Sequence, residues 1–280
     1  MGTWKHDGNF VIRRSLDGGI SWSNPVDNKN GLLFEGEYHT APMPMVIHNG
    51  RLWRAIEHLI SYNASMNTHF CPMVISAPID ADILNAANWI ITNYLPYDSS
   101  YLEGKFNNWL EGNVVVTPEG KMVNILRVST SENGREMAAV INISEDGLTA
   151  SFDPFTGFMN FIGGASKFSI RYDEKSGLYW TIANMVGEGY SDMEAATVRN
   201  TLVLKSSSDL KNWSVNKTLL YHPDVKNHAF QYVDWQFDGR DIIFLSRTAY
   251  DDEFEGAHSY HDANYVTFHR IRNFRKLWKK

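Results

Sequence analysis

The sequence predicts an all-β protein, folded as a single β-propeller domain over residues 1–280, and three observations support this fold class. A unit of two apolar strands joined by a glycine-containing turn occurs four times along the chain. Several units are followed by a further strand pair, which gives four strands in about sixty residues. Helical periodicity is almost absent. We expect five blades, or six if the natural chain begins earlier; a two-sheet sandwich would not predict so regular a repeat.

The four repeated units are apolar runs on either side of a turn glycine. Successive turn glycines are 70, 57 and 62 residues apart, and each lies where a tight hairpin favours positive φ. The units are residues 41–59, 111–127, 167–184 and 230–247, with Gly50, Gly120, Gly177 and Gly239 in their turns.

The two ends of the chain are expected to share the remaining blade. Residues 4–25 are typical of the outer half of a blade whose inner half is absent, so the N-terminal blade is incomplete. Residues 263–274 form an apolar strand that would complete this blade and close the ring.

Composition excludes several classes of function. The net charge of -6 argues against a nucleic-acid binder, which needs a basic face. Cys71 is the only cysteine, so an intrachain disulfide is excluded. No apolar run approaches the roughly eighteen residues of a membrane span. Aromatic residues make up 13% of the chain, which suits either thick β packing or stacking on sugar rings.

The hairpin at 111–127, EGNVVVTPEGKMVNILR, ends in an acid and a base. Counting outward from its turn, Val115 faces Val123 and Glu111 faces Arg127. Such a pair is either an exposed cross-strand ion pair, which is worth little, or part of a site at the end of a sheet.

Residues 15–22, SLDGGISW, match the Asp-box pattern S-x-D-x-G-x-x-W, in which the Asp caps backbone amides and the Trp packs between blades. The match resembles the repeats (BNR repeats) of the bacterial sialidase, or neuraminidase, superfamily. Weaker copies occur at 207–213 (SSDLKNW) and 144–147 (SEDG). The box implies a propeller, and it is a structural turn that carries no chemistry.

Three later segments resemble the catalytic segments of that family. The hairpin 111–127 has the family's sixteen-residue step from acid to base, which implies that Glu111 polarises a tyrosine nucleophile and that Arg127 binds the substrate carboxylate. Arg199, ten residues before the Asp of the second box, is implied as another carboxylate-binding residue. Tyr232, on a strand that leads into an Asp-Gly turn, is implied as the nucleophile.

The resemblance also implies a general acid. Asp7 is the candidate by its position upstream of the first box, while the family's first cluster arginine would lie in the part of the blade that this chain lacks. The proposed set is chemically coherent. A tyrosine has a reference pKa near ~10, so as a nucleophile it needs an adjacent carboxylate to take its proton. The planar guanidinium of arginine can donate two hydrogen bonds to a substrate carboxylate.

Other polar residues are candidates for sugar binding. Tyr38 and His39 precede an inner strand and would face the central funnel, where His39 is also a candidate acid or base. Arg171 and Arg247 lie on inner hairpins. The remaining candidates are His261, Asp262 and Trp109. No zinc-binding pattern is present, and neither a metal nor a cofactor is expected.

The sequence therefore predicts a glycan-active enzyme, a retaining exo-glycosidase of sialidase type acting on an acidic or neutral sugar. Two other classes stay open. A polysaccharide lyase would abstract a proton α to a uronate carboxylate, and a non-catalytic glycan-binding propeller would not need the Tyr-Glu pair. A glycan as the partner also predicts a secreted or periplasmic protein.

Overall fold

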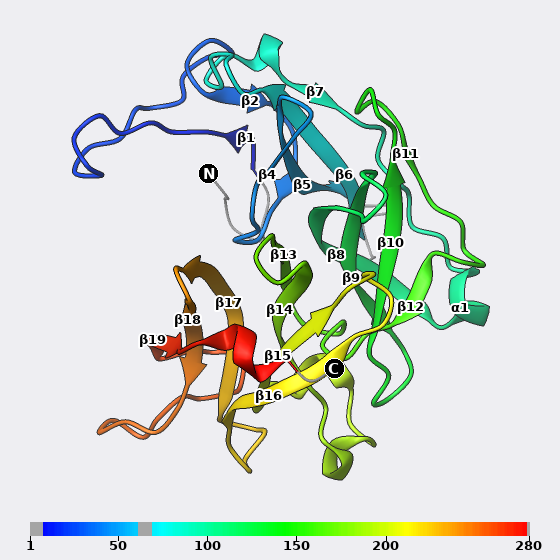
Figure 1. Cartoon of the computed structure of the whole chain (residues 1–280), viewed down its shortest axis with the longest axis vertical. Helices are drawn as coiled ribbons and strands as arrows, with labels where there is room; N and C mark the ends of the chain where they lie inside the picture. The colour runs from blue at the N-terminus through cyan, green and yellow to red at the C-terminus, as the bar shows by residue number, and fades with distance from the viewer. Residues whose placement is uncertain (1–7, 61–68, 279–280) are drawn as a thin grey trace.

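The computed structural model describes residues 8–60 and 69–278, and most of its regular structure is β-strand. The strands form antiparallel sheets that follow one another around a common centre, from β1 (Phe10–Val11) to β19 (Tyr265–Ile271), as Figure 1 shows. The all-β prediction is confirmed, and the sheets are arranged about an axis as in a β-propeller.

The N-terminal half of the chain forms two sheets. In the first, β1 pairs with β2 (Leu32–Phe34). The second has ten strands, which are β3 (Tyr38–His39), β4 (Val46–His48), β5 (Arg51–Ile60), β6 (His69–Pro78), β7 (Ile90–Ile91), β8 (Phe106–Val116), β9 (Met122–Thr130), β10 (Met137–Ile143), β11 (Ala150–Ser151) and β12 (Phe158–Asn160). This sheet divides into β3–β7 and β8–β12, which are joined where Phe70 pairs with Trp109.

The C-terminal half forms a four-stranded and a three-stranded sheet. Their strands are β13 (Ser169–Asp173), β14 (Leu178–Asn184), β15 (Thr201–Ser207), β16 (Ser214–Tyr221), β17 (Ala229–Asp238), β18 (Asp241–Ala249) and β19. Helical segments are short: α1 (Tyr101–Gly104) and the 3-10 turns Ala86–Asn88, Glu188–Tyr190, Ala195–Thr197 and Phe274–Leu277. Each sheet is thus built from neighbouring segments of the chain.

The four predicted hairpins are confirmed. They join β4 to β5, β8 to β9, β13 to β14, and β17 to β18. The predicted register of the second hairpin also holds, since Val115 pairs with Val123. The turn glycines all have left-handed φ, which a residue with a Cβ rarely adopts. Their φ values are +70° for Gly50, +77° for Gly120, +66° for Gly177 and +62° for Gly239.

The prediction that residues 263–274 close the ring with the N-terminal segment is wrong for the described chain. β19 pairs with β18 along its whole length, from Tyr265 opposite Thr248 to Ile271 opposite Ile242, and β1 pairs with β2. β18 occupies one edge of β19, and within the described residues no strand pairs with its other edge.

Three turns with the S-x-D pattern share one hydrogen-bond arrangement. In each, the serine hydroxyl bonds the aspartate carboxylate two residues on, and that carboxylate accepts backbone N–H groups of the residues that follow. The Ser–Asp distances are 2.8 Å for Ser15–Asp17, 2.6 Å for Ser144–Asp146 and 3.0 Å for Ser207–Asp209. The tryptophans differ: Trp22 is 58% exposed, whereas the Trp213 ring lies 5.3 Å from the Phe161 ring.

Large aromatic side chains fill the space between the sheets. Trp53, Trp109, Trp180 and Trp235 are each buried on a different strand. The prediction that Trp109 binds sugar is therefore wrong. Its indole is fully buried and packs against the Phe106 ring at 4.6 Å, so it presents no face to a ligand.

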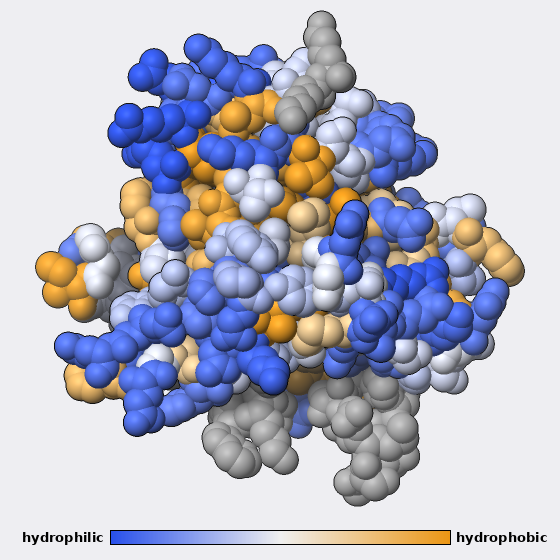
Figure 2. All heavy atoms as spheres, turned by 90° about the horizontal axis from the view of Figure 1, so that it is seen from below, coloured by the Kyte–Doolittle hydropathy of each residue, from blue (hydrophilic) through white to orange (hydrophobic). Residues whose placement is uncertain are grey.

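The outer surface is mixed in character. Figure 2 shows one edge of the molecule, where hydrophilic residues predominate and hydrophobic ones are interspersed. Of the helices in the described ranges, none has both the length and the apolar character needed to span a membrane.

Candidate active site

Two irregular strands bring Glu111 and Tyr232 together. The register of β8 shifts at Glu111, and that of β17 shifts between Gln231 and Asp234. Within the second shift Tyr232 has φ +50°, which is uncommon for a bulky residue with a Cβ. Such bulges redirect side chains and are frequent beside active sites. As a result the Tyr232 hydroxyl donates to Glu111 Oε1 at 3.1 Å, across 121 residues of sequence.

The Glu111 carboxylate lies between two donors. Its Oε1 accepts the Tyr232 hydroxyl, and its Oε2 accepts Arg127 Nη1 at 3.2 Å. Glu111 is 4% exposed and Arg127 is 7% exposed, so this ion pair is buried. The Arg127 fork is oriented by a second bond, from Nε to the carbonyl oxygen of Ala165 at 2.8 Å. The acid and base of the hairpin therefore form a buried ion pair and not an exposed cross-strand pair.

The protonation states follow from this environment. Burial raises the pKa of Glu111, but the charge of Arg127 and hydrogen bonds outweigh it and hold that pKa below its usual value. Burial and the charge of Glu111 raise the pKa of Tyr232. At neutral pH the pair is thus a carboxylate and a neutral phenol. This geometry allows Glu111 to accept the phenolic proton when Tyr232 attacks an electrophile.

Three arginines lie around this pair, with Arg127 on β9, Arg247 on β18 and Arg199 in the loop before β15. Besides Arg127, the Arg199 guanidinium lies 5.7 Å from the Tyr232 ring centroid and the Arg247 guanidinium lies 5.0 Å from it. Arg199 is 5% exposed and is anchored by Nε to the carbonyl of Ala196 at 2.8 Å. These three guanidinium groups form an arginine cluster, and guanidinium groups are suited to anions because their planar N–H donors match carboxylate oxygens.

The loop after β18 orients two of these groups through its backbone. Gln231 donates to the carbonyl oxygens of Tyr260 at 2.7 Å and His261 at 3.1 Å, and it also accepts a hydrogen bond from Arg199. Arg247 Nη2 donates to the same His261 carbonyl at 3.0 Å. The structure thus places the backbone of His261 at the cluster, and Gln231 is a contact of the cluster that the sequence did not reveal.

A second buried acid, Glu57, lies beside the pair and was missed. Glu57 is 1% exposed; its Oε1 accepts the backbone N–H of Gly112 at 2.9 Å, and its Oε2 lies 3.0 Å from His39 Nδ1. The charges of Glu111 and Arg127 act on His39, which places this imidazole in the same site. The only sequence feature that could have identified Glu57 as a site residue is that it is the one acidic residue of strand β5.

A buried lysine, also missed, braces the Tyr232 bulge. Lys167 is 3% exposed and donates Nζ to the carbonyl of Val233, the residue after Tyr232. Burial lowers the pKa of Lys167 to about 8. Its contact with the bulge holds the strained backbone that directs the tyrosine towards Glu111.

The remaining predicted residues lie elsewhere. Tyr38 stacks at 5.1 Å on His58, its cross-strand partner on β5. Arg171 lies over the Trp235 ring at 5.5 Å, further along the inner strands. The side chains of His261 and Asp262 are exposed and contact each other at 3.3 Å. Asp7 lies outside the described residues. Within residues 8–60 and 69–278 no three His, Cys, Asp or Glu side chains are grouped so as to hold a metal ion.

Replacing His39 with glutamine is expected to destabilise the protein most at acidic pH. Burial lowers the pKa of His39, but the hydrogen bond and charge of Glu57 outweigh it and raise that pKa above 6.5. Burial raises the pKa of Glu57 as well, so the pair is charged only where Glu57 is ionised and His39 is protonated. Where Glu57 is ionised, the stability from protonated His39 is present below about pH 6.5 and is lost as pH rises through the folded-state pKa of His39. Thermal unfolding from about pH 5.5 to about pH 8.5 measures the effect.

The matched control for this prediction is His258→Gln, at an exposed histidine in the loop after β18. Its difference in Tm from the parent protein should stay small across the range. A His39→Gln difference that grew with pH would contradict the charged His39–Glu57 pair.

Comparison with known proteins identifies a fold. No family model and no curated protein matches the sequence. A protein of unknown function from Dyadobacter fermentans matches with a TM-score of 0.56 at 12% identity, over 94% of this chain and 64% of that chain. A Trypanosoma rangeli sialidase, solved with the inhibitor DANA, matches with a TM-score of 0.53 at 13% identity, over 97% and 43%.

A levansucrase mutant from B. megaterium matches with a TM-score of 0.50 at 9% identity, over 91% of this chain and 73% of that chain. This chain spans less than two thirds of the length of the first two structures. At such identities the likeness concerns the fold, which is that of a β-propeller.

Proposed function

We propose that this chain is a glycan-active enzyme, a retaining exo-glycosidase of sialidase type that acts on an acidic or neutral sugar. One observation carries the proposal: a neutral tyrosine, a buried carboxylate and an arginine are hydrogen-bonded in series, as Tyr232, Glu111 and Arg127. A tyrosine held this way is suited to covalent catalysis at a cationic centre, which is what an anomeric carbon becomes in glycoside cleavage.

In the proposed first step, Tyr232 Oη attacks the anomeric carbon while its proton passes to Glu111 Oε1. The glycosidic oxygen departs with its bonding electron pair and takes a proton from a general acid. Water then attacks the same carbon and displaces Tyr232 Oη, which recovers its proton from Glu111. Two displacements at one carbon give net retention of configuration.

Two residues are proposed for the general acid. Asp7 is the counterpart implied by the sialidase resemblance, and it lies outside the described residues. His39 is the candidate within the described site, because Glu57 raises its pKa and so keeps a proton available near neutral pH. The acid that protonates the leaving group would then deprotonate the attacking water.

The proposed substrate-binding group is the cluster of Arg127, Arg199 and Arg247. A phenol nucleophile is compatible with an anionic sugar, because it carries no charge to repel the substrate until it attacks. The likeness to the sialidase fold supports this proposal as analogy only. We also propose that the propeller has five blades, formed by β1–β2, β3–β7, β8–β12, β13–β16 and β17–β19. A glycan substrate further suggests a secreted or periplasmic location.

The experiment is a turnover assay on a panel of fluorogenic glycosides with neutral and carboxylate-bearing sugars. The expected result is turnover of at least one glycoside, with NMR showing retained anomeric configuration in the first product. An unsaturated product absorbing in the near ultraviolet would instead indicate a lyase. Binding without any turnover would indicate a glycan-binding propeller and would overturn the enzyme proposal.

Arg247→Gln is expected to lower kcat/KM for a carboxylate-bearing glycoside by roughly 10- to 100-fold, the equivalent of one lost hydrogen bond to a charged group. Turnover of a neutral glycoside should change little. Arg240→Gln, which removes the same charge at the exposed far turn of the β17–β18 hairpin, is the matched control. Equal losses in the two variants would contradict a carboxylate contact at Arg247.

A further inference from the structure

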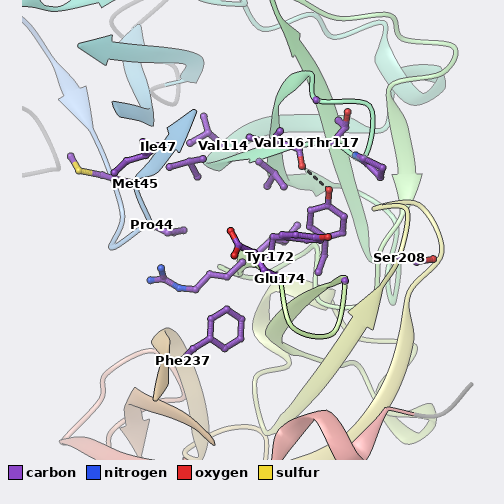
Figure 3. Close-up of a pocket in the computed structure, with 18 residues that line it drawn as sticks. Pro44, Met45, Ile47, Val114, Val116, Thr117, Tyr172, Glu174, Ser208 and Phe237 are labelled. Atoms are coloured by element: carbon purple, nitrogen blue, oxygen red, sulfur yellow. Dashed lines mark hydrogen bonds between the residues drawn. The ribbon is translucent and has the colours of Figure 1, made fainter. Parts of the chain in front are cut away.

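A cavity of about 640 Å³ opens further along the inner strands from Tyr232. β8 carries Glu111 at its middle and ends at Val116, which lines this cavity, and β17 carries Tyr232 and then Phe237, as Figure 3 shows for Val116 and Phe237. Five residues of strand separate the members of each pair, a distance of about 17 Å. The cavity is therefore separate from the arginine cluster, and its volume is that of a small-molecule site.

Most of the cavity wall is apolar. Val114, Val116 and Phe237 line it from the inner strands, and large side chains at its mouth remain open to solvent (Figure 3). Ile47 is 67% exposed and Tyr172 is 49% exposed. Exposed apolar side chains that flank a concave surface are typical of a ligand site, because a ligand's own apolar group would remove them from water.

One cation, Arg171, lines this wall. Among the described residues its buried Nε has no hydrogen-bond partner. Its nearest carboxylate is Asp234, at 3.7 Å, which is an ion pair too long for a hydrogen bond. This Nε is closed to solvent, but the Arg171 side chain as a whole is 28% exposed and lines the cavity, so other N–H groups of its guanidinium can reach an acceptor on a ligand.

Asp234 does not neutralise this region. Its charge acts on Arg54 and Lys167 as well as on Arg171, and Asp234 is itself 56% exposed. Arg54 also interacts with Glu57, and Lys167 with Glu111. Of the carboxylates that the structure describes, however, Asp234 is the one that acts on Arg171. Glu174 also lines the cavity, but it is exposed at the rim, where water screens it. The interior end of the cavity therefore favours a negative group.

We propose that this cavity binds a small amphipathic carboxylate, with its carboxylate on Arg171 and its aryl or branched alkyl group against Ile47, Tyr172 and Phe237. This site is independent of the proposed glycosidase chemistry. It assigns to Arg171 a ligand other than the sugar held by Arg127, Arg199 and Arg247.

The test compares 1-naphthaleneacetate with 1-naphthaleneacetamide, which share the aryl group and differ in charge. Titration calorimetry is expected to show that the carboxylate binds about tenfold more tightly than the amide. Arg171→Gln should abolish that preference, while Arg247→Gln should keep it. Absence of binding by both compounds, or a carboxylate preference that survives Arg171→Gln, would overturn the proposal.

Ile47 offers a second pair of variants, because its exposed side chain can be replaced with little risk to the fold. Ile47→Glu should weaken binding of the carboxylate more than binding of the amide, whereas Ile47→Gln should affect the two compounds equally. Equal effects of Ile47→Glu on both compounds would place the carboxylate elsewhere and overturn the proposal. Because the readout is binding, failure of the glycosidase proposal leaves this test intact.

Discussion

Tyr232→Phe is expected to lower kcat/KM by roughly 10³-fold or more on the best glycoside of the panel, with the fold unchanged. The substitution removes only the phenolic oxygen, so no nucleophile remains to form the covalent intermediate. Glu111 keeps its buried bond to Arg127, and the bulge keeps its contact with Lys167. Glu111 Oε1 loses its tyrosine donor, so the free energy of unfolding should fall by about 1–3 kcal/mol. Steady-state kinetics and thermal unfolding of the same preparation provide the two measurements.

The matched control is Tyr265→Phe, at a tyrosine that is 42% exposed on β19. Its kinetics should equal those of the parent protein. If Tyr232→Phe retained more than about one tenth of the parent activity, Tyr232 would not be the nucleophile.

Glu111→Ala is expected to be among the most destabilising single changes in the chain, at about 3–5 kcal/mol. It removes a buried carboxylate. The Arg127 guanidinium, which is 7% exposed, would then remain charged without a carboxylate partner. Glu111→Gln keeps one oxygen, which can accept from Arg127, and its amide nitrogen can donate to the Tyr232 hydroxyl oxygen, so it should cost less stability than Glu111→Ala. It should still lower kcat by about 10²- to 10⁴-fold, because an amide cannot accept the phenolic proton.

The effect of Glu111 on stability also has a defined pH dependence. The pKa of Glu111 is lowered on folding, so its contribution is present above the unfolded value near about 4.3 and is lost as pH falls through the folded value. Denaturant unfolding at neutral and acidic pH measures this. Glu119→Ala, in the exposed turn of the same hairpin, is the control. Equal stabilities of Glu111→Ala and Glu119→Ala at neutral pH would contradict the buried pair.

The hairpins could be predicted from the sequence because each is local. A glycine that must have positive φ, placed between two apolar runs, specifies a turn and the register of the strands beside it, as with Gly120 and the Val115–Val123 pair. The same local rule failed at the chain ends. An isolated strand pattern such as 263–274 does not say which edge it will join, and β19 joined its nearest neighbour.

The candidate site was predicted in part for the same reason. Glu111 and Arg127 lie opposite each other within one hairpin, so their meeting follows from strand register. The contact of Glu111 with Tyr232 depends on a bulge in another sheet, and only the resemblance to sialidases suggested it. Glu57 and Lys167 could not be assigned, because a lone charge in an apolar strand does not reveal which group it meets.

The central claim is that Tyr232 forms the covalent bond to the sugar. Incubation with a fluorinated glycosyl fluoride of the preferred sugar slows hydrolysis of the intermediate and allows it to accumulate. Peptide mass spectrometry should then find one glycosyl group on Tyr232 in the parent protein and none in Tyr232→Phe. A label on another residue, or turnover with inverted configuration and no label, would contradict the claim.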